Sequence, residues 1–287
     1  MIIRGSETVL VQGITGKQGT FWSERMRDYG TRIIGGVNPK RAGEKHLDLP
    51  VWATARDAAR ESKIDAAVMF IPPFGVKEAA LDAIEAGIGK IVCLTEHVPV
   101  HDTMYFLAAA RERGAQVIGP NTAGIVTVGE CFVGFMPAFN ARVFQPGNVG
   151  VISRSGSLGT LLCLNLVQAG LGISAFVGIG GDPVIGTTTK DALVALDKDA
   201  KTKSIALVGE IGGSMEEEAA EYARTMKKPI AAFIAGAASP PGKRMGHAGA
   251  IVMGDKGSYA GKKKALEAAG VTVCSTPNGV AEVLRKV

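Results

Sequence analysis

The stretch "VLVQGITGKQGTFW", residues 9–22, places an apolar strand directly before Gly13, Gly16 and Gly19 and then a helical segment. Glycines allow a tight turn after the strand, and the free N–H groups at the start of a helix attract a phosphate group. The spacing is GxxGxxG, which differs from the dinucleotide fingerprint GxGxxG. The stretch therefore predicts a strand–turn–helix unit, with either a phosphate site or a plain tight turn between strand and helix.

Strand-like apolar runs and helical patterns alternate along the whole chain. The predicted strands lie at residues 8–12, 33–37, 66–71, 90–94, 116–118, 149–153, 174–177, 204–208 and 230–234. The predicted helices lie at residues 20–29, 56–62, 76–86, 103–113, 158–169, 188–196, 216–226 and 260–269. This alternation is typical of α/β proteins with doubly wound parallel sheets. It breaks over residues 121–148, so we expect a domain over 1–122, a linker over 123–148 and a second domain over 149–287.

Composition narrows the class of protein. A chain of 287 residues is expected to form about two domains, and its apolar fraction of 46% with only 6% aromatic residues suits parallel sheets covered on both faces. No apolar run approaches the roughly 20 residues that span a bilayer, and the chain enters a strand without a leader. We therefore expect a cytoplasmic protein that does not bind a membrane.

Cysteines and charges point away from metal and nucleic-acid chemistry. The four cysteines lack the spacing of a metal site or a disulfide framework. The net charge of +5 is spread along the chain without an aromatic-interleaved basic patch, which fits a small polyanionic ligand better than a nucleic acid. The one short basic run, Lys262–Lys264, is predicted to lie on the solvated face of a helix.

The second strand discriminates between nucleotide ligands. An NAD-binding protein normally carries an acidic residue about 20 residues after the glycines. Here "IIGGVNPKRAG", residues 33–43, places Lys40 and Arg41 at that point, which suits a ribose phosphate as in NADP or coenzyme A. The loops "FIPPF" (70–74), "TEHVP" (95–99) and "IGPNTAG" (118–124) follow later strands, where ligands of such sheets bind. "FIPPF" could instead simply end its strand.

The second domain repeats the strand–turn–helix pattern. "VGVISRSGSLGTLLCLN", residues 149–165, offers Ser153, Ser155, Gly156 and Ser157 as donors to an anion at a helix start, or as an ordinary helix cap. Downstream, "SPPGKRMGHAGAIV", residues 239–252, places His247 in a loop rich in glycine and proline. A histidine that faces a helix start can carry a phosphoryl group as a covalent adduct, whereas a loop histidine is otherwise a surface residue. The remaining histidines are predicted at the surface of the first domain: His46, His97 and His101.

Seven motifs, taken together and in this order, resemble the α subunit of succinate–CoA ligase. They are "GITGKQGTF", "GGVNP", "IGPNTAGI", "SRSGSLG", "GIGGDPVIG", "GEIGGSMEEEAA" and "GKRMGHAGAI". The resemblance runs from about residue 5 to the C-terminus and extends to malate–CoA ligase α subunits and the C-terminal part of ATP-citrate lyase. It implies a Rossmann-like CoA-binding domain followed by a flavodoxin-like ligase domain.

The resemblance also assigns roles to residues. His247 would be phosphorylated in turn by a nucleoside triphosphate and by an acyl phosphate, Glu210 would hydrogen-bond it, and the 153–157 turn would hold the phosphate. A set of residues would bind coenzyme A: Gly13, Thr15, Gly16, Lys17, Gln18, Gly19, Val37, Pro39, Arg41, Ile71, Pro72, Thr95, Glu96 and Asn121. The chain lacks a GxxxxGK[ST] loop, so ATP or GTP with Mg²⁺ is expected mainly on a β subunit, in an αβ or α2β2 assembly.

Two segments depart from the family. Pro39, Lys40 and Arg41 stand where the family has Pro-Gly-Lys, and because the segment stays basic, coenzyme A binding is still expected. The second departure is in the serine motif. Succinate-specific chains continue this motif as Ser-Gly-Thr-Leu-Thr-Tyr-Glu, whereas here Gly159, Thr160 and Leu161 follow Ser157 and Leu158. Gly159 is expected to add room and Leu161 to remove a charge, so the small di- or tricarboxylic acid could be malate or another acid. Two further alternatives remain: a non-catalytic CoA-binding sensor, and an NADP-dependent oxidoreductase that leaves the second domain unexplained.

Overall fold

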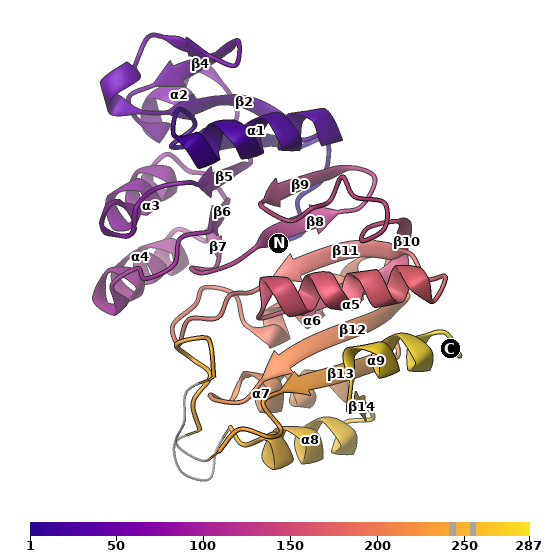
Figure 1. Cartoon of the computed structure of the whole chain (residues 1–287). Coiled ribbons are helices and arrows are strands. Elements are labelled where there is room, and N and C mark those ends of the chain that lie inside the picture. Colours follow the sequence, from indigo (N-terminus) through magenta and orange to yellow (C-terminus); the bar gives the residue numbers. More distant parts are fainter. Residues whose placement is uncertain (241–244, 253–256) are drawn as a thin grey trace.

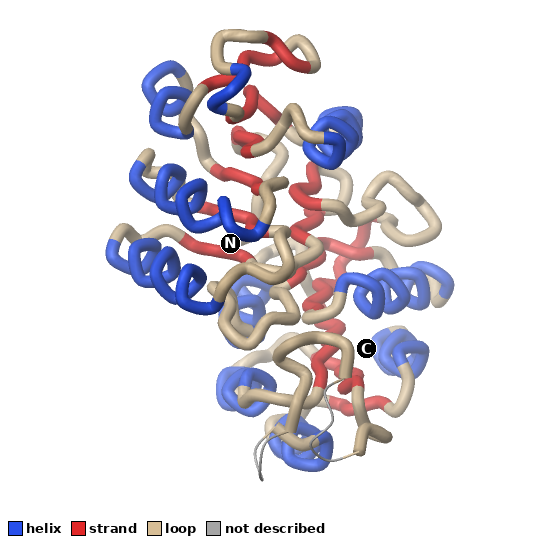
Figure 2. The backbone as a smooth tube through the Cα atoms, turned by 60° about the vertical axis from the view of Figure 1, so that its left-hand side comes forward, coloured by secondary structure: helices blue, strands red, loops and turns tan. Residues whose placement is uncertain are grey.

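The structure is a computed structural model that describes residues 1–240, 245–252 and 257–287. Its described residues form two seven-stranded sheets, in the orders β3-β4-β2-β1-β5-β6-β7 and β14-β13-β12-β10-β11-β8-β9. The two sheets follow each other along the chain, and helices cover both faces of each (Figures 1 and 2). The predicted α/β class is therefore confirmed. None of the described helices is long and apolar enough to cross a membrane.

The first sheet is parallel except at one edge. Its strands are β1 (Thr8–Gln12), β2 (Arg32–Val37), β3 (Lys45–His46), β4 (Leu49–Trp52), β5 (Ala66–Met69), β6 (Lys90–Cys93) and β7 (Gln116–Ile118), and only β3 runs antiparallel to its neighbour. Its helices are α1 (Lys17–Tyr29), α2 (Ala55–Glu61), α3 (Val76–Glu85) and α4 (Val100–Glu112), with short 3₁₀ turns at Pro39–Arg41 and Pro73–Gly75. Strands β1 and β5 are buried on both faces. For this reason each contains a continuous apolar run in the sequence.

The second sheet has a parallel core and an antiparallel extension. The parallel strands are β10 (Pro146–Ser153), β11 (Ile173–Gly178), β12 (Ser204–Glu210), β13 (Ile230–Ala235) and β14 (Thr272–Cys274). Its helices are α5 (Gly156–Gln168), α6 (Thr189–Lys198), α7 (Met215–Ala223), α8 (Tyr259–Ala268) and α9 (Pro277–Leu284). The capping box at Thr188 and Asp191 starts α6, and Ser155 caps α5.

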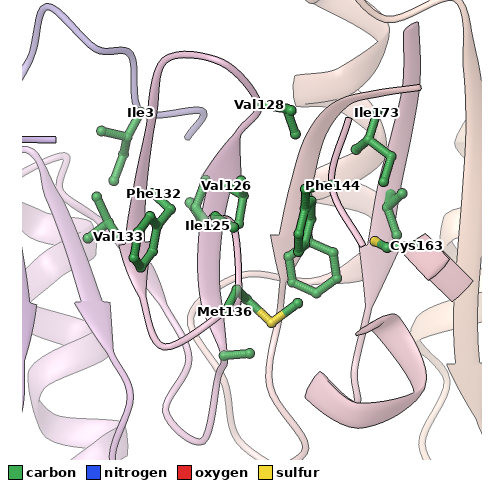
Figure 3. Close-up of a cluster of buried hydrophobic side chains, with 14 of the residues drawn as sticks. Ile3, Ile125, Val126, Val128, Phe132, Val133, Met136, Phe144, Cys163 and Ile173 are labelled. Atoms are coloured by element: carbon green, nitrogen blue, oxygen red, sulfur yellow. The ribbon is translucent and has the colours of Figure 1, made fainter. Parts of the chain in front are cut away.

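Part of the segment predicted as a linker, 123–148, is regular structure. It contains the hairpin β8 (Gly124–Thr127) and β9 (Cys131–Gly134), and β8 pairs antiparallel with β11 of the second sheet. All eight residues of these strands are buried, so the alternation of polar and apolar residues that marks a half-exposed strand is missing. Figure 3 shows the resulting core, where side chains of this hairpin lie between Ile3 and residues of β11 and α5.

The first residues of the chain tie the two sheets together. Ile3 is fully buried, and its carbonyl accepts a hydrogen bond from the Thr127 hydroxyl at 2.5 Å. Arg4 then forms ion pairs with Asp199 at 2.6 Å and with Glu130 at 3.2 Å. These contacts connect the segment before β1 to the hairpin and to the end of α6, so the chain is anchored on the second domain before it enters the first sheet.

One charged group lies where residue type alone does not place it. Lys262, predicted on a solvated helix face, has a side chain with 0% exposure and forms ion pairs with Glu216 and Glu217. This correction arises because two acidic residues of α7 neutralise the ammonium group, which allows it to be buried. Among the remaining histidines, His97 and His101 are exposed, whereas the Nε2 atom of His46 lies 2.8 Å from the Thr20 hydroxyl.

Candidate active site

A cavity of about 780 Å³ opens at the carboxyl ends of β1, β2 and β5. Eight of the residues predicted to bind coenzyme A line it: Gly13, Thr15, Gly16, Val37, Pro39, Arg41, Ile71 and Pro72. Gly13 has a φ of +84°, and a Cβ there would lie 2.3 Å from the Phe70 carbonyl oxygen, so only glycine fits this turn. The Asn38 side chain donates to the Thr15 hydroxyl at 2.5 Å and accepts from the Lys40 backbone N–H at 3.0 Å. These bonds order the rim of the cavity.

Other members of the predicted set lie elsewhere. Lys17 and Gln18 are exposed on the first turn of α1, and Gln18 accepts a hydrogen bond from Trp22 at 3.1 Å. Gly19 is buried beneath the turn, where a Cβ would lie 2.1 Å from the Gly13 carbonyl oxygen. Its role in the structure is therefore to let α1 approach the turn closely.

A second cavity, of about 350 Å³, surrounds His247 at the carboxyl ends of β10 and β12. The Nδ1 atom of His247 lies 2.7 Å from Glu210 Oε2. Because a carboxylate only accepts hydrogen bonds, the neutral imidazole carries its proton on Nδ1, which leaves the lone pair of Nε2 free to act as a nucleophile. The predicted partnership of these two residues is thus present in the geometry.

The environment of His247 favours its charged form. The hydrogen bond to Glu210 raises the pKa of His247 above the ordinary value and outweighs partial burial, which lowers it. The charge of Arg154 opposes the rise, and that of Glu96, from the first domain, adds to it. A protonated imidazole cannot attack phosphorus, so the nucleophile forms only as the pH rises through this elevated pKa.

Arg154 is a residue that the sequence reasoning missed. Its side chain is almost fully buried, with Nη2 3.2 Å from Glu210 Oε1 and Nη1 donating to the Gly212 carbonyl at 3.4 Å. It therefore holds the carboxylate that binds His247. A charged residue at the end of an otherwise apolar strand is the signal that could have identified it, because such residues are buried only with a partner.

The serine turn contributes to the same cavity in two different ways. Ser155 and Ser157 line the cavity, and their hydroxyl oxygens lie 3.2 Å apart at the start of α5. Ser153 is fully buried and donates to the Ser155 carbonyl at 2.6 Å, so it supports the turn instead of facing the cavity. Gly156 is the first residue of α5. The helix start and the imidazole therefore border one space, which is suited to an anion held next to His247.

A chain of hydrogen bonds connects the two cavities. The Thr95 hydroxyl donates to the Ile71 carbonyl at 2.8 Å, and the Thr95 carbonyl accepts from the Asn121 N–H at 2.9 Å. The Asn121 carbonyl accepts from Gly181 at 3.2 Å, and the Gly181 carbonyl accepts from Gly249, two residues after His247, at 3.2 Å. Thr95 and Asn121 thus lie at the junction between the cavities and do not line the larger one.

The segment that departs from the family pattern is arranged differently from the expectation. Gly159 does not add room, because a Cβ there would lie 2.6 Å from the Phe176 ring, which fills the space. The side chain of Leu161 is 42% exposed and does not line the cavity. Leu158 is the residue of this segment that does line the cavity next to Ser157.

Glu210→Gln isolates the effect of the carboxylate on His247. We expect the pKa of His247 to fall toward the ordinary value of about 6.5, because the neutral amide no longer stabilises the imidazolium. An NMR titration of the imidazole in the isolated chain measures this. Glu96→Gln, which removes a weaker influence, should produce a smaller fall. An unchanged titration in Glu210→Gln would contradict the assigned pair.

Two protein families match the chain, and each match spans the residues that line one of the two cavities. The CoA binding domain family matches residues 5–97, and the CoA-ligase family matches residues 152–272. The first match contains the glycine turn and the larger cavity, and the second contains the serine turn and His247. The two matches together define the class of the protein as a CoA ligase with a CoA-binding domain.

Relatives narrow this class to one family. The chain is 47% identical over 287 residues to a protein of Archaeoglobus fulgidus named ADP-forming succinate–CoA ligase subunit alpha 2, covering 100% of this chain and 99% of that protein. It is 40% identical over 287 residues to an ADP-forming sulfoacetate–CoA ligase subunit of Bilophila wadsworthia, covering 99% of this chain and 98% of that protein. The chain belongs to the succinate–CoA ligase α-subunit family.

A solved structure carries the same fold within a longer chain. ATP citrate lyase of Methanosaeta concilii, in complex with (3S)-citryl-CoA, matches with a TM-score of 0.90 and 27% identity. The match covers 100% of this chain and 50% of that chain, so the present protein spans about half the length of that lyase.

Proposed function

We propose that this chain is the α subunit of an NTP-dependent acid–CoA ligase that works through a phosphohistidine on His247. The observation that carries the proposal is the Glu210 carboxylate, 2.7 Å from Nδ1 of His247, in a cavity that also contains the start of α5. The carboxylate fixes the tautomer, and the α5 start stabilises the charge of a phosphoryl group bound to Nε2. Coenzyme A would occupy the larger cavity of the first domain.

The reaction would proceed in three balanced steps. His247 Nε2 attacks the γ-phosphorus of the nucleoside triphosphate. A P–N bond forms as the bond from the γ-phosphorus to the oxygen of the β-phosphate breaks, and the nucleoside diphosphate leaves. The carboxylate of the acid then takes the phosphoryl group from His247 and becomes an acyl phosphate. Finally, the thiolate of coenzyme A attacks the acyl carbon and phosphate leaves. A β subunit would hold the triphosphate with its Mg²⁺, and names of relatives as ADP-forming favour ATP as the donor.

The acid is proposed only as a small carboxylic acid. Succinate is favoured by the names of several relatives, and sulfoacetate is the second candidate because relatives at 40% and 42% identity are named for it. Both acids carry a second anionic group, which the junction between the cavities would have to bind. Leu158, which lines the His247 cavity, is the residue of the altered segment placed to affect this choice.

Intact mass tests the proposal directly. The purified chain is mixed with a succinate–CoA ligase β subunit and MgATP at neutral to alkaline pH, without acid or coenzyme A, because phosphohistidine is labile at low pH. We expect one added phosphoryl group, which is discharged when coenzyme A and the correct acid are added. A chain that binds coenzyme A but never gains a phosphoryl group, even with its own partner, would be a CoA-binding sensor. Preference for NADPH over coenzyme A would support the oxidoreductase.

A further inference from the structure

The buried ammonium group of Lys262 has three acceptors and no use in the reaction as described. Its Nζ atom donates to the Gly213 carbonyl at 3.0 Å, to Glu217 Oε2 at 3.0 Å and to Glu216 Oε2. Both Lys262 and Glu216 have side chains with 0% exposure. A buried ion pair costs desolvation free energy, so full pairing of this kind explains how the charge is tolerated but not why it is there.

Glu216 connects this ion pair to the partner of His247. Its second oxygen, Oε1, accepts a hydrogen bond from the Glu210 backbone N–H at 3.3 Å. The carboxylate also lies directly against β12, since a Cβ on Gly209 would be 2.7 Å from Glu216 Oε1. The same carboxylate therefore binds Lys262 on one side and the end of β12 on the other.

Lys262 also holds the turn that supports the segment after His247. The turn after Glu210 includes Gly212 and Gly213, and Lys262 binds the Gly213 carbonyl. A Cβ on Gly212 would lie 2.2 Å from the Gly249 carbonyl oxygen and 2.7 Å from the Ile251 nitrogen. This turn is thus in close backbone contact with the residues that follow His247, so a shift of the turn must displace one or both partners of the pair.

We propose that Lys262 and Glu216 are positioning residues that hold Glu210 and the 249–251 segment in the register at which Glu210 binds His247. Their contribution to catalysis rests on the proposed function of His247, whereas their effect on the Glu210–His247 pair can be measured without it. The pair fixes the Glu210 backbone N–H and the Gly213 carbonyl behind the site, and preorganisation of this kind is lost after small displacements.

Two matched double variants separate positioning from folding. Lys262→Met alone leaves the Glu216 carboxylate buried without its cation and is expected to lower the melting temperature. Lys262→Met with Glu216→Gln, and Lys262→Met with Glu216→Leu, both remove this buried charge and should recover stability. The glutamine retains an acceptor for the Glu210 N–H, whereas leucine does not. Lys263→Met is the control, because Lys263 neighbours Lys262 on α8 but is 40% exposed and pairs with Glu267.

The first readout is the NMR titration of His247 in the isolated full-length chain, with the resonance assigned by His247→Asn. The charged groups that face His247, namely Glu210, Arg154 and Glu96, are unchanged in every variant. We expect the pKa of His247 to fall in the leucine double variant in the direction seen for Glu210→Gln, to fall less in the glutamine double variant, and to stay unchanged in Lys263→Met. A folded leucine double variant with the wild-type titration would overturn the proposal.

The second readout is the rate of His247 phosphorylation with a β subunit and MgATP, well below the melting temperature. We expect a reduction of about 10- to 100-fold in the leucine double variant, with the affinity for coenzyme A unchanged because that cavity lies in the other domain. A normal phosphorylation rate beside a lowered His247 pKa would overturn the role in positioning for catalysis. If the wild-type chain itself is never phosphorylated, the proposed function fails, while the titration still decides whether Lys262 and Glu216 hold the pair.

Discussion

Replacing His247 by asparagine should abolish the phosphoryl adduct and reduce the overall ligase rate by at least about 10³-fold. The amide N–H of asparagine can still donate one hydrogen bond to Glu210, but the amide is not a nucleophile at neutral pH. The phosphoryl group would then have no carrier between the nucleotide and the acid. Intact mass at alkaline pH measures the adduct. A coupled assay for the nucleoside diphosphate that is released measures turnover.

His97→Asn is a suitable control for this experiment. His97 lies in the first domain, its side chain is 89% exposed, and it lies outside both cavities. We expect the His97→Asn variant to gain the same phosphoryl adduct and to turn over at the same rate as the wild type. A phosphoryl group that persists on the His247→Asn chain would place the intermediate on another residue and would refute the assigned role of the Glu210–His247 pair.

Gly13→Ala should remove binding of coenzyme A while His247 is still phosphorylated. The glycine has a φ of +84°, and an added Cβ would lie 2.3 Å from the Phe70 carbonyl oxygen, an atom of fixed backbone. The turn must therefore move away from β5, which changes the rim of the larger cavity. We expect affinity for coenzyme A to fall by about 100-fold or more, as titration calorimetry can measure, because the backbone donors of the turn are displaced.

Gly43→Ala provides a matched control for backbone strain. Gly43 has a similar φ of +87°, but no atom lies within 4 Å of the Cβ that alanine would add. This variant carries the same conformational cost without the clash, so it should bind coenzyme A as the wild type does. If both variants lost affinity equally, the loss would come from general destabilisation and not from the geometry of the glycine turn.

Elements with local signals were predictable from the sequence. The predicted strand 8–12 coincides with β1, and the predicted strand 116–118 coincides with β7, because each is a short apolar run bounded by turn residues. The hairpin β8–β9 was missed because its alternation disappears when both faces are buried, one of them by packing of α1. Helix α9 was also missed, although Thr276 and Pro277 form an ordinary helix start.

The residues of the candidate site also divide into those that a local motif predicts and those that depend on distant parts of the chain. The glycine turn and the serine turn are local motifs, and each contributes part of its predicted residues to a cavity. Gly13, Thr15 and Gly16 line the larger cavity, and Ser155 and Ser157 line the His247 cavity. Glu210 and His247 are 37 residues apart, and only the resemblance to the ligase family brought them together before the structure did. Arg154 and Lys262 were invisible because residue type predicts exposure for both, whereas their burial depends on acidic partners from other elements. Gly159 was misinterpreted because the aromatic ring that fills its space comes from a neighbouring strand.

The hairpin in the middle of the chain has a consequence for how this protein can be divided. Its strands extend the second sheet, yet α1 of the first domain covers them, and the buried Ile3 adds a third segment to the same core (Figure 3). A gene cut near codon 122 would leave apolar surface exposed on both fragments, so neither half is expected to be soluble when expressed alone. The match to the longer ATP citrate lyase covers 100% of this chain, so it includes both sides of this shared core.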